Sequence, residues 1–116
     1  MTRILLTDRA VRDVEEIERY SEGRWGRAVA DAYLDDIERA LDRIGASPGI
    51  IQRRLAVSAH LRFYPVREHV LVCDMVLGAV VVLAVWHGSM DVAARIGVLA
   101  PQLARDLASA RVRLGG

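Results

Sequence analysis

The sequence predicts an α+β fold in which an N-terminal strand and an αα-hairpin pack on a mainly antiparallel sheet, with a helix at the C-terminus. Residues 70–86 form an almost uninterrupted apolar run, with Asp74 its one charged residue and a break near Gly78, as expected for a buried β-hairpin. Apolar residues recur at helical spacing in two segments before this run and one after it. The chain of 116 residues is 53% hydrophobic, which suits a single domain with one substantial core.

The N-terminal segment predicts a short strand over residues 3–6, followed by a helix. Thr7 and Asp8 are both good helix N-caps, so the helix should run from about Asp8 to Glu22. The expected apolar face consists of Val11, Val14, Ile17 and Tyr20 or Ser21. The two glycines between residues 21 and 26 indicate a turn after this helix.

The second helix is the most regular periodic segment of the chain. Its apolar positions are Trp25, Ala28/Val29, Ala32/Tyr33, Ile37, Ala40/Leu41 and Ile44. Pro48 and two glycines in residues 45–49 end it. Because each helix of the pair has only one apolar stripe, the pair must pack on the predicted sheet.

Three antiparallel strands should form most of that sheet. Residues 60–66 alternate between apolar and polar side chains, and Pro65 places this strand at an edge or a bulge. Residues 70–77 and 79–86 are nearly all apolar, which predicts strands covered on both faces. Gly78-Ala79 lies between them, and Gly78 at the first central position suits a type II′ turn.

The C-terminal segment predicts a helix that begins after an Asp91 N-cap. Gly97 and Pro101 allow a break, after which Leu99, Leu103 and Leu107 form a narrow apolar stripe. We therefore expect one domain over residues 1–116, with a core at 3–96 and a helical extension at 97–114.

Charge is unevenly distributed along the chain. Residues 1–46 hold 8 Arg and 11 acidic residues, whereas residues 47–116 hold 8 Arg and 4 acidic residues. The basic half would face nucleic acid, an acidic partner or solvent. Every basic residue is Arg, with no Lys.

Several classes of protein and site are not expected. No signal segment or membrane span is evident, so we expect a cytoplasmic protein. The single Cys73 is expected to be a core residue. His60, His69 and His87 lack the spacing of metal ligands, and no nucleotide-binding or hydrolase motif occurs, so neither a metal nor a cofactor is predicted.

The order and spacing of several short motifs resemble the RelE/ParE superfamily of toxins from type II toxin–antitoxin modules, and the ParE branch most. The resemblance spans about residues 3–96. The segments that carry it are Thr7-Asp8-Arg9-Ala10, Asp13-Val14-Glu15-Glu16-Ile17, Leu61-Arg62-Phe63, His69-Val70-Leu71-Val72 and Val85-Trp86-His87-Gly88-Ser89-Met90-Asp91.

This resemblance implies a toxin held inactive by a cognate, ParD-like antitoxin in a hetero-oligomer. ParE-like members inhibit DNA gyrase by binding, whereas RelE-like members are metal-independent endonucleases that cut ribosome-bound mRNA. Where the family often has Tyr, Arg and Arg, this chain has Cys73, Ala84 and Ser89, which removes groups suited to binding phosphate. We therefore favour a non-enzymatic gyrase inhibitor.

Two alternatives remain at this point. A RelE-like nuclease would use Arg62 and His87, of which only His87 titrates near neutral pH. A degenerate homologue would bind antitoxin without being toxic. In every case, antitoxin binding needs exposed apolar residues rimmed by charge. The expected contacts are Tyr20, Trp25, Tyr33, Leu99, Leu103 and Leu107.

Overall fold

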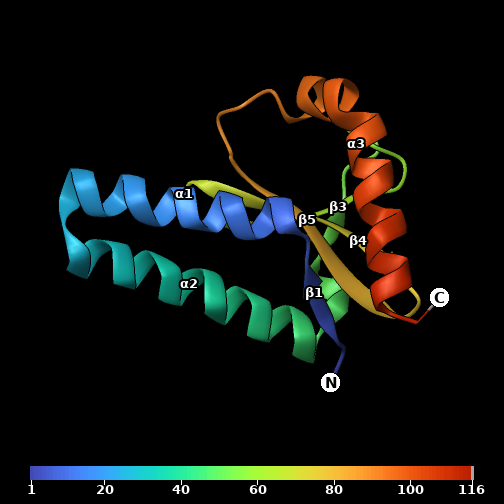
Figure 1. Cartoon of the computed structure of the whole chain (residues 1–116), viewed down its shortest axis with the longest axis horizontal. Coiled ribbons are helices and arrows are strands. Elements are labelled where there is room, and N and C mark those ends of the chain that lie inside the picture. Colours follow the sequence, from blue (N-terminus) through green and yellow to red (C-terminus); the bar gives the residue numbers. More distant parts are fainter. Residues whose placement is uncertain (116) are drawn as a thin grey trace.

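The computed structural model describes residues 1–115 and confirms the α+β class. The elements in chain order are β1 (Ile4–Leu6), α1 (Asp8–Trp25), α2 (Arg27–Ala46), the 3-10 turn η1 (Pro48–Ile50), β2 (Gln52–Arg53), β3 (Arg62–Val66), β4 (His69–Val76), β5 (Ala79–His87) and α3 (Val92–Arg113). The sheet order is β1-β5-β4-β3-β2, with β1 parallel to β5 and the other pairs antiparallel. The α1–α2 pair and α3 lie on either side of the sheet (Figure 1).

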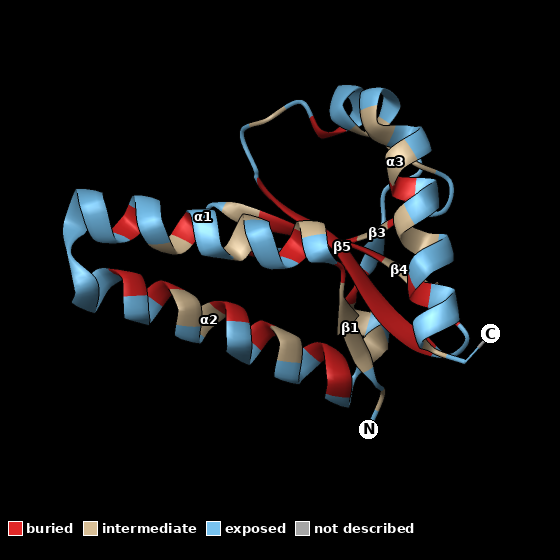
Figure 2. Ribbon diagram, viewed as in Figure 1, coloured by how far each residue is buried: buried red, intermediate tan, exposed pale blue. Residues whose placement is uncertain are grey.

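The β4–β5 hairpin forms the centre of the molecule, as predicted. Residues 79–86 of β5 are all buried, and β5 crosses the middle of the structure as a continuous buried strand (Figure 2). One core cluster lies between the sheet and the α1–α2 pair, and a second lies between the sheet and α3. Cys73 is a core residue, and its burial raises the pKa of the thiol to about 12.

The turn of this hairpin differs from the prediction. The two loop residues are Leu77 and Gly78, because Val76 pairs with Ala79. Both have positive φ, at 50° and 77°, which is the signature of a type I′ turn rather than type II′. Gly78 takes the second central position, where it adopts positive φ without a Cβ clash. The twist of a type I′ turn matches the twist of the strands that it joins.

The buried face of α1 is rotated relative to the predicted one. Ala10, Ile17 and Ser21 are buried, whereas Val11 is 44% exposed. The Thr7 cap explains this rotation, since its Oγ1 accepts the Ala10 N–H at 3.1 Å and donates to the Leu83 carbonyl at 3.0 Å. This buried side chain therefore joins the start of α1 to the central strand.

The connection between α1 and α2 is also shorter than expected. Only Gly26 separates the helices, with φ of 94°, and it lies at the far end of the pair from the sheet (Figure 1). The last turns of α1 consequently have little sheet beneath them. Tyr20 and Trp25 remain 62% and 54% exposed for this reason.

The C-terminal helix α3 continues through Gly97 and Pro101. Its first turns run across one end of the sheet, and the remainder descends along the sheet (Figure 1). Pro101 lacks the N–H that would bond to the Gly97 carbonyl, which favours a bend there. Leu103 is buried against the second core cluster, and Arg9 and Asp106 form an ion pair at 3.5 Å between α1 and α3. Within residues 1–115 no helix has the length and apolar character needed to cross a membrane.

Candidate binding site

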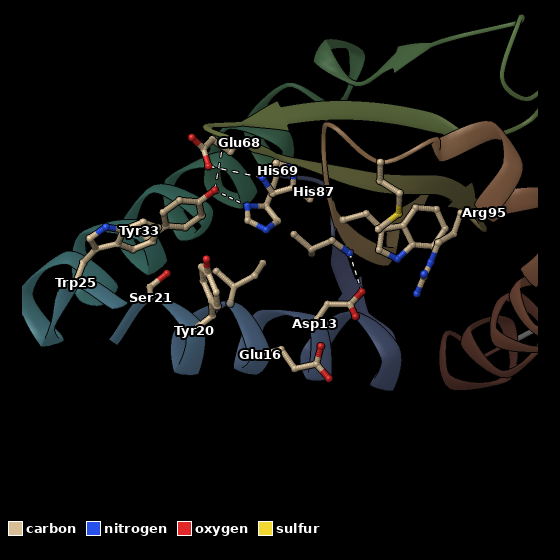
Figure 3. A pocket seen from close by; sticks show the side chains of 14 residues that line it. Asp13, Glu16, Tyr20, Ser21, Trp25, Tyr33, Glu68, His69, His87 and Arg95 are labelled. Atoms are coloured by element: carbon tan, nitrogen blue, oxygen red, sulfur yellow. Dashed lines mark hydrogen bonds and ion pairs between the residues drawn. The ribbon is translucent and has the colours of Figure 1, made fainter. Parts of the chain in front are cut away.

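A cavity of about 410 Å³ lies where α1, α2, the open end of the β4–β5 hairpin and the start of α3 meet (Figure 3). The helix α1 lines it with side chains three or four residues apart, since those positions share one helix face. The lining residues are Asp13, Glu16, Ile17, Tyr20, Ser21, Trp25, Tyr33, Glu68, His69, Val85, Trp86, His87, Met90 and Arg95. Four aromatic rings and several ionisable groups therefore border one hollow.

A network of polar side chains closes the sheet side of the cavity. The Tyr33 hydroxyl contacts His69 Nδ1 and accepts the Glu68 N–H at 3.3 Å. The tyrosine hydroxyl donates to His69 Nδ1 in the tautomer that carries the imidazole proton on Nε2. Burial, and secondarily the neighbouring His87, lower the pKa of His69, so its ring is neutral at pH 7.

His87 is directly opposite His69 in the strand register, and the ring centroids are 5.2 Å apart. The Ser89 N–H donates to His87 Nδ1 at 3.1 Å, and Ser89 Oγ lies 2.6 Å from the same nitrogen. A backbone N–H can only donate, so Nδ1 is an acceptor and the neutral ring carries its proton on Nε2. That nitrogen faces Glu68 at 3.6 Å.

Asp13 is the half-buried acid of the cavity. Its carboxylate accepts the Val85 N–H at 3.0 Å, which links α1 to the last residues of β5. Burial raises the pKa of Asp13, and that hydrogen bond and the charges of Arg9 and Arg95 oppose the shift. Arg95 lies over the Trp86 ring at 5.4 Å, so the α3 end of the cavity has a cation of its own.

The two residues predicted for a nuclease lie apart. Arg62 on β3 pairs with Cys73, whereas His87 on β5 pairs with His69. Cys73 and His69 are four residues apart on β4, which corresponds to about 13 Å along the strand. Arg62 is instead opposite Arg53 of β2, and neither lines the cavity.

The residues predicted to contact an antitoxin fall into two groups. Tyr20 and Trp25 are exposed beside the cavity, with their rings edge to face at 5.8 Å, whereas Tyr33 is 8% exposed and holds the histidine network. Leu103 is buried on the opposite face of the sheet, and Leu99 and Leu107 are partly buried there. An antitoxin would reach Leu103 only if α3 moved off the sheet.

Sequence reasoning did not identify most of the residues that line the cavity. Asp13, Glu68, His69, Trp86 and Arg95 come from four different parts of the chain, and no local motif joins them. One signal for the site was present in the sequence, since each strand of the predicted hairpin has a histidine near its open end. Which residues of the two strands are opposite each other can be estimated by counting outward from the turn. That count alone pairs His69 with Trp86, since a β-bulge shifts the register between Val72 and Cys73.

The fold and the sequence define the class of this protein. A solved structure described as the chromosomal ParDE toxin–antitoxin system from P. aeruginosa superposes with a TM-score of 0.66 over 75% of this chain and 96% of that chain. At 13% identity this likeness shows the fold alone. A family model described as the ParE toxin of the type II toxin-antitoxin system, parDE, matches residues 4–92.

The chain belongs to this ParE toxin family. It is 32% identical over 100 residues to Toxin ParE1 of Mycobacterium tuberculosis, covering 78% of this chain and 94% of the relative. It is 29% identical over 97 residues to Toxin ParE of Escherichia coli, covering 83% of this chain and 94% of the relative. For Toxin ParE1 of Caulobacter vibrioides, the identity is 31% over 101 residues, covering 79% and 95%.

Proposed function

We propose that this ParE-type toxin inhibits DNA gyrase in the cytoplasm by binding it, and that a ParD-like antitoxin blocks this activity in a hetero-oligomer. The observation that carries the proposal is the exposed aromatic pair Tyr20 and Trp25 beside an open cavity. A surface of this kind suits binding of another protein, because binding buries the large apolar area of exposed aromatic side chains.

The separation of Arg62 from His87 also supports inhibition by binding. Cleavage of RNA without a metal needs a base, an acid and cations gathered around one phosphate. Arg62 on β3 is level with Cys73, whereas His87 on β5 is level with His69, about 13 Å away along β4. A binding mechanism requires no such convergence.

We propose that the antitoxin covers Tyr20, Trp25 and the rim of the cavity at Tyr33. The acidic α1–α2 pair would attract a basic antitoxin segment and raise its association rate. Leu99, Leu103 and Leu107 would form a second contact only in a complex in which α3 is displaced.

Induced expression in a gyrase-proficient host tests the toxin proposal. We expect growth arrest with double-strand breaks and an SOS response, and the purified protein should inhibit supercoiling by gyrase. Co-expression of a cognate ParD-like antitoxin should restore growth. Growth without any defect would contradict both toxin mechanisms and favour a homologue that only binds antitoxin.

The same assay distinguishes the RelE-like alternative. Rapid arrest of translation with cleaved mRNA would indicate a ribosome-dependent nuclease. In that case, Arg62→Ala and His87→Ala should each abolish killing while antitoxin binding persists. Under the gyrase proposal, cells expressing either variant should still show the SOS response.

A further inference from the structure

We infer that one end of the cavity binds an arginine side chain of a partner polypeptide. This end, called here the aromatic–acidic end, is formed by Tyr20, Trp25, Tyr33 and Glu68, and Glu16 lines the cavity farther along α1, beside Asp13. Figure 3 shows side chains from α1, from α2 and from the β3–β4 turn at this end. The inference rests on the proposed function for the identity of the partner, which is the antitoxin, but not for the chemistry of the subsite.

The charges that line the cavity do not balance. Three carboxylates and one cation, Arg95, line it. Asp13 accepts the Val85 N–H and has Arg9 and Arg95 nearby, so hydrogen bonding and positive charge from the chain itself partly offset the cost of its burial. Within residues 1–115, no arginine forms an ion pair with Glu16 or Glu68, so their negative charges are not compensated in this way.

The two glutamates leave a net negative charge on the wall of the cavity, with Glu68 at the aromatic–acidic end and Glu16 next to it on α1. Across residues 1–115, Glu16 forms no ion pair, and the partner of Glu68 is His87 at 3.6 Å. The Ser89 N–H occupies His87 Nδ1, so the ring presents only Nε2 to Glu68, at a separation beyond hydrogen-bond distance. A ligand at this end should accordingly be a cation.

Two aromatic rings at this end are largely exposed. Tyr20 and Trp25 are 62% and 54% exposed, although both line a concavity in which a flat group can contact them. A guanidinium is planar and weakly hydrated, so it stacks on aromatic faces better than an ammonium does. Aromatic surface together with free carboxylates therefore favours arginine over lysine.

Two of the aromatic rings at this end already contact arginine side chains of this chain that lie outside the cavity. The guanidinium carbon of Arg24 lies 6.0 Å from the centre of the Trp25 ring, and that of Arg67 lies 5.0 Å from the centre of the Tyr33 ring. Neither arginine lines the cavity. Both rings thus already contact a guanidinium of this chain, whereas among residues 1–115 no guanidinium lies over the Tyr20 ring, which is left for one from a partner.

A titration with a small arginine compound tests the subsite without any partner protein. The chain has two tryptophans, both of which line the cavity, so its two indole N–H signals in ¹⁵N–¹H spectra report on opposite ends. N-acetylarginine methylamide should cause a saturable shift of the Trp25 signal and a smaller shift of the Trp86 signal. N-acetylcitrulline methylamide, which has nearly the same shape without the charge, should cause little shift. Equal shifts from both compounds, or none at Trp25, would overturn the inference.

Matched variants connect the subsite to the partner. The double variant Glu16→Gln/Glu68→Gln should bind the arginine compound about tenfold more weakly, since two exposed charge contacts are lost. Glu15→Gln, which changes an exposed neighbour on α1 that does not line the cavity, should bind like the wild type. Calorimetry with the cognate ParD-like antitoxin should show the same ranking.

The outcomes separate the two proposals. If the antitoxin binds the double variant as tightly as it binds Glu15→Gln, the arginine subsite is overturned while the proposed function stands. If the antitoxin does not bind the wild type at all, the antitoxin proposal fails, and the arginine titration still decides whether the subsite exists.

Discussion

The two ends of the β4–β5 hairpin differ in both packing and chemistry. At the turn end, Val76 and Ala79 are buried and the strands close through the two-residue turn Leu77–Gly78. At the open end, His69 and His87 face each other beside a cavity lined by ionisable groups. The same pair of strands therefore supplies the core along most of its length and a polar surface where it ends.

A β-bulge separates the packed part of the hairpin from its polar open end. On the turn side, Cys73 pairs with Val82, and on the open side Val72 pairs with Ala84, so Leu83 is the extra residue. Such an insertion reverses the faces of the residues that follow it. As a result, His87 rather than Trp86 is opposite His69, and Trp86 joins the core cluster on the α3 side.

The largest expected effect comes from the packed middle of the hairpin. Leu83 is fully buried in the cluster beneath α3, so Leu83→Ala should lower the free energy of unfolding by about 3 kcal/mol, measured by urea denaturation. Val98→Ala, at a position of α3 that is 79% exposed, should change it by less than about 0.5 kcal/mol. Similar losses in the two variants would contradict the assignment of the core to the middle of the hairpin.

A smaller effect of opposite sign is expected at the turn end. Leu77 has φ of 50° and is 51% exposed, so it bears backbone strain and gains little from burial. Leu77→Asn creates the Asn-Gly pair that type I′ turns prefer and should raise the melting temperature, with a gain of about 1 kcal/mol. Leu77→Val should lower it, because a β-branched residue tolerates positive φ poorly. A stabilised valine variant would argue against the type I′ turn.

The smallest effect is expected at the open end and depends on pH. Burial holds the pKa of His69 below its ordinary value of 6.5 in the folded state. Between the lowered pKa of folded His69 and pH 6.5, the unfolded chain binds a proton that the folded protein does not. Stability therefore falls as the pH drops through 6.5 toward the lowered pKa. His69→Gln keeps a group that can hydrogen-bond to Tyr33 but cannot titrate in this range.

Melting curves between pH 8 and pH 5 give the measurement for this third prediction. Stability should fall less steeply with acidification in His69→Gln than in the wild type. His60→Gln, which removes an exposed histidine from the loop before β3, should keep the wild-type slope. If both variants had the wild-type slope, burial of His69 would not contribute to the pH dependence.

The elements of the fold were predictable because each has a local signal. Thr7 marks the start of α1, Pro48 follows the end of α2, and the apolar run of residues 79–86 identifies a buried strand. Which face of a helix is buried was harder to predict than whether the helix forms. The outward rotation of Val11 follows from the bond between Thr7 and the distant Leu83 carbonyl, which no helical pattern contains.

The cavity was only partly predictable. Tyr20, Trp25, Tyr33 and His87 were identified as candidates, the aromatics because large apolar residues stand near the edge of a helical stripe. Their assembly with Asp13, Glu68 and Arg95 was not apparent, since these residues are ordinary surface charges when read one at a time.

The sequence by itself determined the order of elements, the central buried hairpin and the membership in the ParE family, because periodicity and short motifs are properties of neighbouring residues. Only the tertiary structure decided which histidines meet and where the cavity lies. A single bulge reverses the faces of all later residues of β5, and the length of the α1–α2 pair beyond the sheet leaves Tyr20 and Trp25 uncovered. Both outcomes depend on contacts between residues far apart in the chain.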